Sequence, residues 1–131
     1  MDTRELLGRF TSSFGNPDRM VELLAPQAEW WITPTVGILG SPTVGRDSIR
    51  TALEIIFGTL YMDVRISVHQ VLVEGNAGAA RLTMNAAALF AAGRPYENEY
   101  SLWILSDGEL ITHVWEYLDV AHAAGQFGLQ R

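Results

Sequence analysis

The stretch RPYENEYSLWILSDGELITHVWEYLD, residues 94–119, decides the fold of this chain. Its first half alternates polar and apolar residues, and SDG at 106–108 then predicts a tight turn before a second apolar-rich run. Alternate positions of a strand share one face, so Asn98 and Tyr100 would point to the same side. A neighbouring strand would bring Glu116 near them. Two adjacent strands could thus line a pocket with hydrogen-bond donors and one carboxylate.

The same period of two extends upstream of this stretch. From Met62 onward, apolar and polar residues alternate, with predicted turns at 74–76, 92–95 and 106–108. Strands that follow one another through short turns form an antiparallel meander. The second half of the chain therefore predicts a mostly antiparallel sheet. The tail from 120 to 127 predicts a short closing helix or an extended arm.

The first third of the chain has the spacing of helices. Asn16 can cap a second helix, Pro17 suits its first position, and this helix should end before Pro26. A short strand is expected at 29–32. The apolar residues of the first helix fall on one face: Leu6, Leu7, Phe10 and Phe14.

Beyond that strand, the Pro and Gly residues of 34–45 predict a long loop that could form a lid or rim. A third helix, with Asp47 in its first turn, is expected from there. Helices followed by strands predict an α+β fold in which the helices pack on one side of a curved sheet. The face of the third helix that should turn inward comprises Ile49, Ala52, Leu53, Ile56, Phe57 and Leu60.

Composition limits the function classes. The chain has 131 residues, 48% of them hydrophobic, which suffices for one domain over 1–131 with its own core. The absence of cysteine favours a reducing cytoplasm, and we expect neither a signal peptide nor a membrane span. A net charge of −6 with nine scattered basic residues argues against a nucleic-acid partner. His69, His113 and His122 lie far apart, so we expect no metal site, and we expect no cofactor.

Two stretches carry a family resemblance: VGRDSIRTALEIIF at 44–57 and the strand pair at 94–119. With the preceding helices and the Trp-bearing strand, the chain resembles the nuclear transport factor 2-like superfamily in its SnoaL-like branch, over nearly its whole length. The resemblance implies a cone-shaped roll, with a strongly curved sheet wrapped around about three N-terminal helices and a deep apolar pocket. It also implies a homodimer through the outer sheet face, where Trp103, Trp115 and Tyr117 would lie.

Ketosteroid isomerase, another member of this superfamily, uses one tyrosine and two aspartates. Those positions match Phe10, Ile32 or Thr33, and Tyr100 in this sequence. Two of the three side chains cannot play the same part, so the resemblance does not extend to that enzyme's residue set.

Limonene epoxide hydrolase uses an aspartate, an arginine and a second aspartate to hold and activate water. The last aspartate matches Glu116, whereas the other two positions fall near Thr83 and Asn85. Arg81 is close by, but the partner carboxylate is missing, so epoxide hydrolysis is disfavoured.

SnoaL-like polyketide cyclases rely on one acid/base carboxylate on the last strand, and Trp115-Glu116 fits that place. We therefore predict Glu116 as the general acid/base and Tyr100 and Asn98 as donors to a substrate oxygen. The function expected is proton-transfer chemistry of cyclase, isomerase or dehydratase type on a small hydrophobic oxygenated molecule. The expected substrate-binding residues are Trp30, Thr83, Asn85, Leu89, Tyr96, Leu102, Ile104 and Val114.

Two alternatives stay open at this point. The chain could be a non-catalytic apolar-ligand-binding or dimerisation module of the same fold, with Glu116 in a structural hydrogen-bond network. The last strand could also shift by one residue if the DG turn rather than the EYLD ending sets its register. Then His113, Trp115 and Tyr117 would face the pocket instead of Glu116.

Overall fold

The computed structural model describes residues 1–32 and 42–126. Most of the predicted loop at 34–45, and the end of the tail, lie outside the described residues. The elements in chain order are α1 (Thr3–Ser12), α2 (Pro17–Glu22), β1 (Leu24–Ile32), β2 (Thr43–Val44), α3 (Arg46–Ile55), the π-helical turn η2 (Ile56–Leu60), β3 (Tyr61–Glu74), β4 (Ala77–Ala88), the 3-10 turn η3 (Leu89–Ala91), β5 (Arg94–Ser106), β6 (Ile111–Leu118) and α4 (Val120–Gln126).

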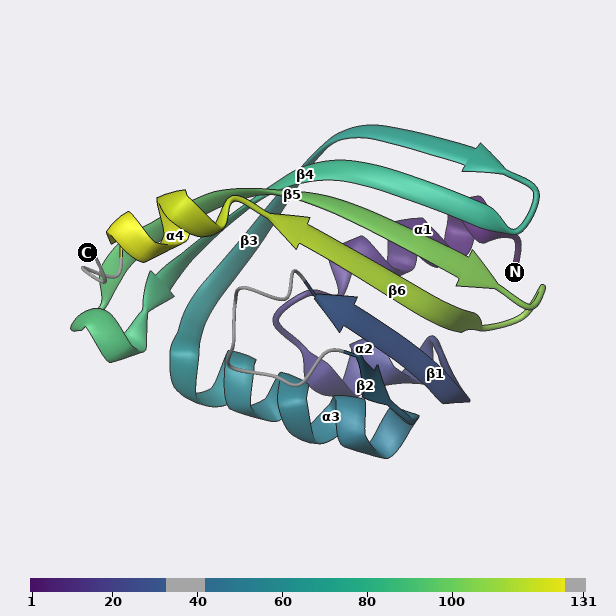
Figure 1. Ribbon diagram of the computed structural model, residues 1–131, viewed down its shortest axis with the longest axis horizontal. Helices are drawn as coiled ribbons and strands as arrows, with labels where there is room; N and C mark the ends of the chain where they lie inside the picture. The colour runs from purple at the N-terminus through teal and green to yellow at the C-terminus, as the bar shows by residue number, and fades with distance from the viewer. Residues whose placement is uncertain (33–41, 127–131) are drawn as a thin grey trace.

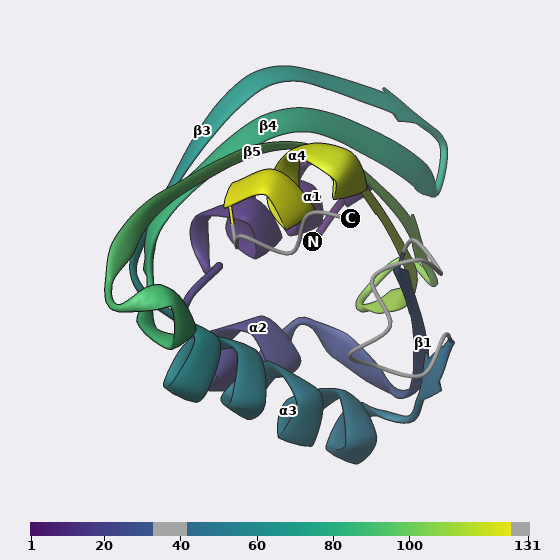
Figure 2. The same cartoon turned by 60° about the vertical axis from the view of Figure 1, so that its left-hand side comes forward.

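One curved sheet dominates the structure. Its six strands run in the order β2-β1-β6-β5-β4-β3, and only β1 and β6 pair in parallel. In Figures 1 and 2 the long strands β3, β4 and β5 arch over α1, while α2 and α3 lie on the concave side of the sheet, farther from these strands. The expected α+β roll with a mostly antiparallel sheet around N-terminal helices is confirmed.

The curvature of the sheet has a local cause in β3. Its pairing with β4 shifts between Met62 and Arg65, and Asp63 in that gap takes a left-handed φ of 55°. A second shift occurs between Val68 and Gln70. Such bulges bend a strand and increase its twist, so the sheet can wrap around the helices.

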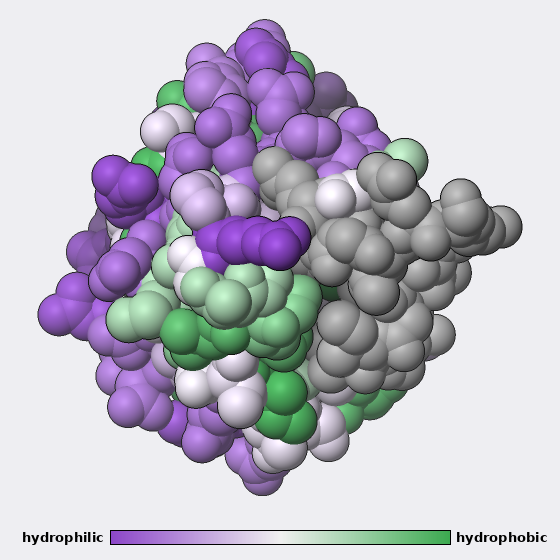
Figure 3. Space-filling view, turned by 90° about the vertical axis from the view of Figure 1, so that its left-hand side faces the viewer, coloured by the Kyte–Doolittle hydropathy of each residue, from purple (hydrophilic) through white to green (hydrophobic). Residues whose placement is uncertain are grey.

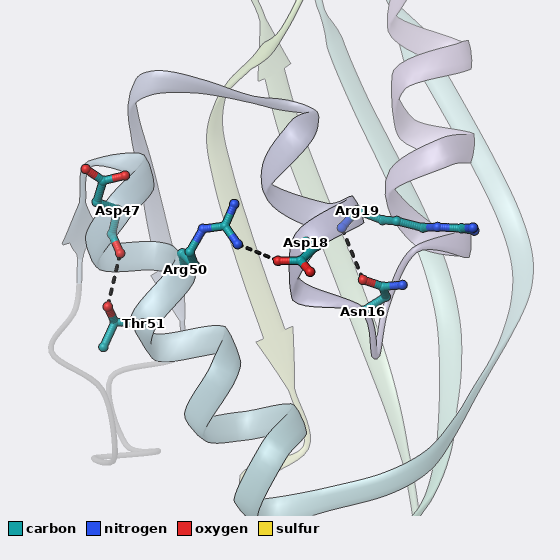
Figure 4. Close-up of polar contacts among 6 residues, drawn as sticks. All are labelled: Asn16, Asp18, Arg19, Asp47, Arg50 and Thr51. Atoms are coloured by element: carbon teal, nitrogen blue, oxygen red, sulfur yellow. Dashed lines mark hydrogen bonds and ion pairs between the residues drawn. The ribbon is translucent and has the colours of Figure 1, made fainter.

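The short helices start as the sequence predicts. The side chain of Asn16 accepts a hydrogen bond from the backbone N–H of Arg19 at 3.2 Å, and Pro17 is the first helical residue. Figure 4 shows this cap and the exposed ion pair between Arg50 of α3 and Asp18 of α2. The two helices thus form one layer that closes one side of the hollow.

Strand β1 differs from the prediction, because it begins at Leu24 rather than near Glu29 and so contains Pro26. The register between β1 and β6 shifts between Leu24 and Glu29. Proline has no N–H to give to a sheet, so it is tolerated where the ladder is interrupted. The interruption therefore lets β1 run past Pro26 and place Trp30 beside β6.

Candidate active site

An apolar pocket opens between α3, η2 and the concave face of the sheet. Its volume, counted as the space open to the centre of a water molecule, is about 80 Å³. One water needs roughly 10–15 Å³ by this measure, so the pocket suits a small molecule. Its lining consists of Phe14, Met20, Trp30, Ile32, Thr43, Ile49, Ala52, Leu53, Ile56, Phe57, Leu60, Tyr61, Met84, Tyr100, Glu116 and Leu118.

The end of the molecule that carries η3 and α4 has a partly apolar surface. Figure 3, viewed from this end, shows apolar residues gathered near its centre, with polar residues above them and to their left. Leu89 and Phe90 of η3 are exposed, and the ring of Phe90 lies 6.1 Å from that of the pocket residue Tyr61. An apolar ligand would therefore meet apolar side chains outside the pocket as well.

Glu116 is the only carboxylic acid that lines the pocket among the described residues. It pairs with Leu102 of β5 and Ile32 of β1, in the register set by the EYLD ending. Trp30 donates its indole N–H to Oε1 of Glu116 at 3.0 Å. Burial of the carboxyl group raises the pKa of Glu116 to about 7, although the bond from Trp30 lowers it.

Tyr100 is a second polar group on the pocket wall. It lies diagonally across from Glu116 on the same face of the sheet, because Tyr100 pairs with Leu118 and Leu102 with Glu116. Burial raises the pKa of Tyr100 well above its usual value, and the neighbouring Tyr96 and Glu116 raise it further. Tyr100 therefore stays a neutral hydroxyl that can donate a hydrogen bond.

Asn98 lies behind the pocket, and it does not line it. Its Nδ2 donates to Oη of Tyr96 at 3.1 Å and to the backbone oxygen of Asp119 at 3.0 Å, while its Oδ1 accepts from the N–H of Glu99 at 2.8 Å. These partners fix which way the amide points. Asn98 is therefore not part of the lining of this pocket, and its contact with a ligand stays a prediction.

Tyr96 connects Asn98 to the pocket wall. Its hydroxyl oxygen lies 2.7 Å from that of Tyr100, so the two hydroxyls share a hydrogen bond. Oη of Tyr96 also accepts from Asn98 and bonds to Tyr61, and either hydroxyl of the Tyr96–Tyr100 pair can be the donor. Where Tyr96 is the donor, the hydrogen of Tyr100 is left for the pocket. Tyr96 itself is 1% exposed and does not line the pocket.

Several residues predicted to bind substrate lie elsewhere. Thr83 and Asn85 alternate along β4 with Met84, which faces the pocket, so they lie on the outer face, where Thr83 bonds to His69. Leu89 is exposed on η3. Three more of the predicted substrate-binding residues face the concave side but are buried in the core and do not line the pocket: Leu102, Ile104 and Val114. Of the eight, only Trp30 lines the pocket.

Sequence reasoning missed Tyr61 and assigned no site role to the helical wall. Tyr61 begins β3, lines the pocket, and packs against Tyr96 with ring centroids 4.9 Å apart. Burial raises its pKa, and Tyr96 raises it further. The α3 and η2 residues of the lining all belong to the apolar helix face that the sequence predicts. The apolar periodicity of residues 49–60 is therefore the sequence signal that could have identified the helical wall of the pocket.

The outer face of the sheet carries aromatic residues. Trp103 and Tyr117 are about half exposed, at 49% and 45%. The ring of Trp31 contacts that of Tyr117 at 5.0 Å, and His113 stacks on Trp115 at 5.5 Å. His113, Trp115 and Tyr117 are absent from the pocket lining, so the structure has the register that the EYLD ending predicts.

Two further features concern the described residues alone. No cluster of three His, Cys, Asp or Glu side chains suited to a metal ion occurs in residues 1–32 and 42–126. In the same part of the chain, no helix combines the length and the apolar character needed to cross a membrane.

A family model described as the SnoaL-like domain matches residues 10–114. The chain belongs to the SnoaL-like domain family. The match covers the strand that carries Tyr100 and ends two residues before Glu116. Family membership therefore supports the fold, whereas any role of Glu116 has to be argued from its geometry. No curated protein matches the chain.

Solved structures share the fold of this SnoaL-like chain at low sequence identity. A protein with a ketosteroid isomerase-like fold from Catenulispora acidiphila, in complex with trimethylamine, is 17% identical with a TM-score of 0.82, covering 98% of this chain and 95% of that one. TerC, co-crystallised with polyporic acid, is 15% identical with a TM-score of 0.83, covering 96% and 98%. A candidate polyketide cyclase from Xanthomonas campestris is 17% identical with a TM-score of 0.80, covering 95% and 96%.

Proposed function

We propose that this SnoaL-like protein is an acid–base enzyme of cyclase, isomerase or dehydratase type that acts on a small hydrophobic oxygenated molecule. The observation that carries the proposal is Glu116, a carboxylic acid in an apolar pocket with a pKa of about 7. A group whose pKa lies near the working pH can both take up and release a proton. Tyr100 lies on the same wall as a neutral donor.

The reaction step follows from these two groups. The carboxylate of Glu116 takes a proton from the carbon next to a substrate carbonyl, and the electrons of the broken C–H bond form the C=C bond of an enolate. The negative charge collects on the oxygen, which accepts a hydrogen bond from Tyr100. Protonated Glu116 then returns the proton to another carbon, or to a departing hydroxyl group, which leaves as water.

The pocket walls select the substrate in this proposal. Aromatic and aliphatic side chains from α3, η2 and β1 surround the two polar groups, so an apolar ring would bury its surface against Phe57, Ile56 and Trp30. The oxygen of that ring would be held near Tyr100. A charged ligand would find no buried cation among the residues that line this pocket.

Hydrogen–deuterium exchange on small cyclic ketones tests the proposal without knowledge of the natural substrate. We expect the protein to speed exchange next to the carbonyl in D₂O, as followed by proton NMR. Glu116→Gln should abolish the acceleration while keeping the pocket's shape, and Glu99→Gln, an exposed glutamate on the outer face, serves as the matched control. If Glu116→Gln kept full activity, or if the wild type bound the ketones without exchange, a non-catalytic binding module would be the better account.

We also propose that two copies pair through the outer face of the sheet. The exposed aromatic residues Trp103 and Tyr117, with Trp31 and Trp115 beside them, form an apolar area that a second copy would cover. Sedimentation velocity should show a dimer for the wild type and a monomer for Trp103→Glu. A wild type that sediments as a monomer at all concentrations would overturn this proposal.

A further inference from the structure

Trp30 is held rigidly beside Glu116. It lies on β1 opposite Val114, two residues from the position where Ile32 pairs with Glu116, so Trp30 and Glu116 are diagonal neighbours on the parallel strands β1 and β6. The indole is 7% exposed, and its ring contacts Phe10 at 5.4 Å and Phe14 at 6.3 Å. Packing on this side prevents the ring from swinging away from the carboxyl group.

The chemistry of the indole limits what the carboxyl group can do. The Nε1–H of tryptophan donates a hydrogen bond and never accepts one. The indole N–H of Trp30 donates to Oε1 of Glu116 at 3.0 Å. When Glu116 is protonated, a proton on Oε1 would turn the strong carbonyl acceptor into a weaker hydroxyl oxygen. The better arrangement keeps Oε1 as the carbonyl oxygen and places the proton on Oε2.

We propose that Trp30 is a positioning residue that restricts the transferable proton of Glu116 to Oε2. This rests on the proposed acid–base role of Glu116 and adds which oxygen performs it. The same oxygen would then take the proton from the substrate and return it, because rotation of the carboxyl group would break the bond to Trp30. Proton removal and return would therefore occur on one face of the substrate.

Three titratable side chains of residues 1–32 and 42–126 interact electrostatically with Glu116. They are the tyrosines 61, 96 and 100, which come from β3 and β5. Burial raises the pKa of each above its usual value, so all three remain neutral as Glu116 titrates. Glu116 is then the group whose protonation changes the hydrogen bond of Trp30.

The indole N–H signals in a proton–nitrogen NMR spectrum report this bond directly. The chain has four tryptophans, so each signal can be assigned with single Trp→Phe variants. We expect the Trp30 signal to move with a midpoint of about 7 and to lose this transition in Glu116→Gln. Trp31 and Trp103, on the other face of the sheet, serve as controls, whereas Trp115, which stacks on His113, is left out of the comparison.

The carbonyl stretch of protonated Glu116 decides which oxygen holds the proton. A difference infrared spectrum between the wild type and Glu116→Gln isolates this band at low pH. Loss of a donor to a carbonyl oxygen raises its stretching frequency, so Trp30→Phe should move the band upward, and Trp103→Phe should leave it in place. An unchanged or lowered band in folded Trp30→Phe would overturn the assignment to Oε2.

The outcomes separate this inference from the proposed function. If Glu116 titrates near 7 but the Trp30 signal stays constant, Trp30 does not position the carboxyl group, and the acid–base role still stands. If Glu116 titrates near the ordinary value of 4.5, the proposed function itself fails. Trp30→Phe should also raise the Glu116 midpoint above that of the wild type, because the indole bond lowers it.

Discussion

Replacing Glu116 with glutamine should make the protein more stable at pH 8 than the wild type, and equally stable at pH 4. Folding raises the pKa of Glu116 from 4.5 to about 7, because burial disfavours the charged form. A carboxyl group with a raised pKa contributes its full stability below pH 4.5, and this contribution is lost as the pH rises through 7. Glutamine carries no charge at any pH, so the stability of Glu116→Gln does not fall in this way as the pH rises.

The size of the effect follows from the two pKa values. One pH unit of difference corresponds to about 1.4 kcal/mol, so the interval from 4.5 to about 7 corresponds to at most about 3.5 kcal/mol. Water that reaches the partly exposed residue reduces this figure. The gain of Glu116→Gln over the wild type should thus grow from near zero at pH 4 to between about 1 and 3 kcal/mol at pH 8.

Urea unfolding of both proteins across this pH range measures the difference. Tryptophan fluorescence follows the transition, and equal slopes against urea show that the mutation leaves the unfolded surface unchanged. Glu99→Gln, at an exposed position on the outer face, is the matched control in the same titration. If the free energy of unfolding of Glu116→Gln differed from that of the wild type by the same amount from pH 4 to pH 8, the claim that the folded protein buries an acid at this position would be refuted.

Three other substitutions test the surrounding structure by thermal unfolding. Asn98→Ala should cost about 1–3 kcal/mol, because Tyr96 and the backbone oxygen of Asp119 lose their donor; an unchanged melting temperature would argue against that network. Gly78→Ala should cost roughly 1–3 kcal/mol, because a Cβ there would lie 3.2 Å from Leu7 and 3.3 Å from Thr3; a gain in stability would show that α1 gives way easily. Arg50→Ala, which removes the exposed ion pair in Figure 4, should cost less than about 1 kcal/mol, and a larger loss would mean that this pair holds α2 and α3 together.

The sequence predicts the strands that carry the site because their alternation is strong. Along β5, Tyr96, Asn98 and Tyr100 are buried while the residues between them are exposed, so one face is unambiguous. The ending EYLD then predicts the register of β6 that the structure has, whereas alignment on the DG turn would shift this register by one residue. Burial on one side thus makes register readable from a single sequence.

The family resemblance predicts Thr83 and Asn85 in the pocket, whereas the residue pattern of β4 predicts that they lie on the outer face. Leu82, Met84 and Ala86 alternate with polar residues, and this alternation predicts that the apolar set faces inward, as the structure shows. The superfamily comparison pointed the other way, because it assigned catalytic positions by analogy. Where the two disagree, the burial pattern of the chain itself is the stronger guide.

Other parts of the site could not be predicted from local patterns. Tyr61 stands at the junction between η2 and β3, where the helical period ends and the strand period begins. The bond between Trp30 and Glu116 joins residues 86 positions apart through a parallel strand pair. Such contacts depend on the topology of the sheet, which periodicity does not determine.

Carbon-13 NMR titration of the Glu116 carboxyl group in the intact protein tests the central claim most directly. Comparison with Glu116→Gln assigns the signal. The account predicts a midpoint of about 7. A midpoint near 4.5 would show that water reaches this carboxyl group freely, and would contradict an acid–base site in the pocket.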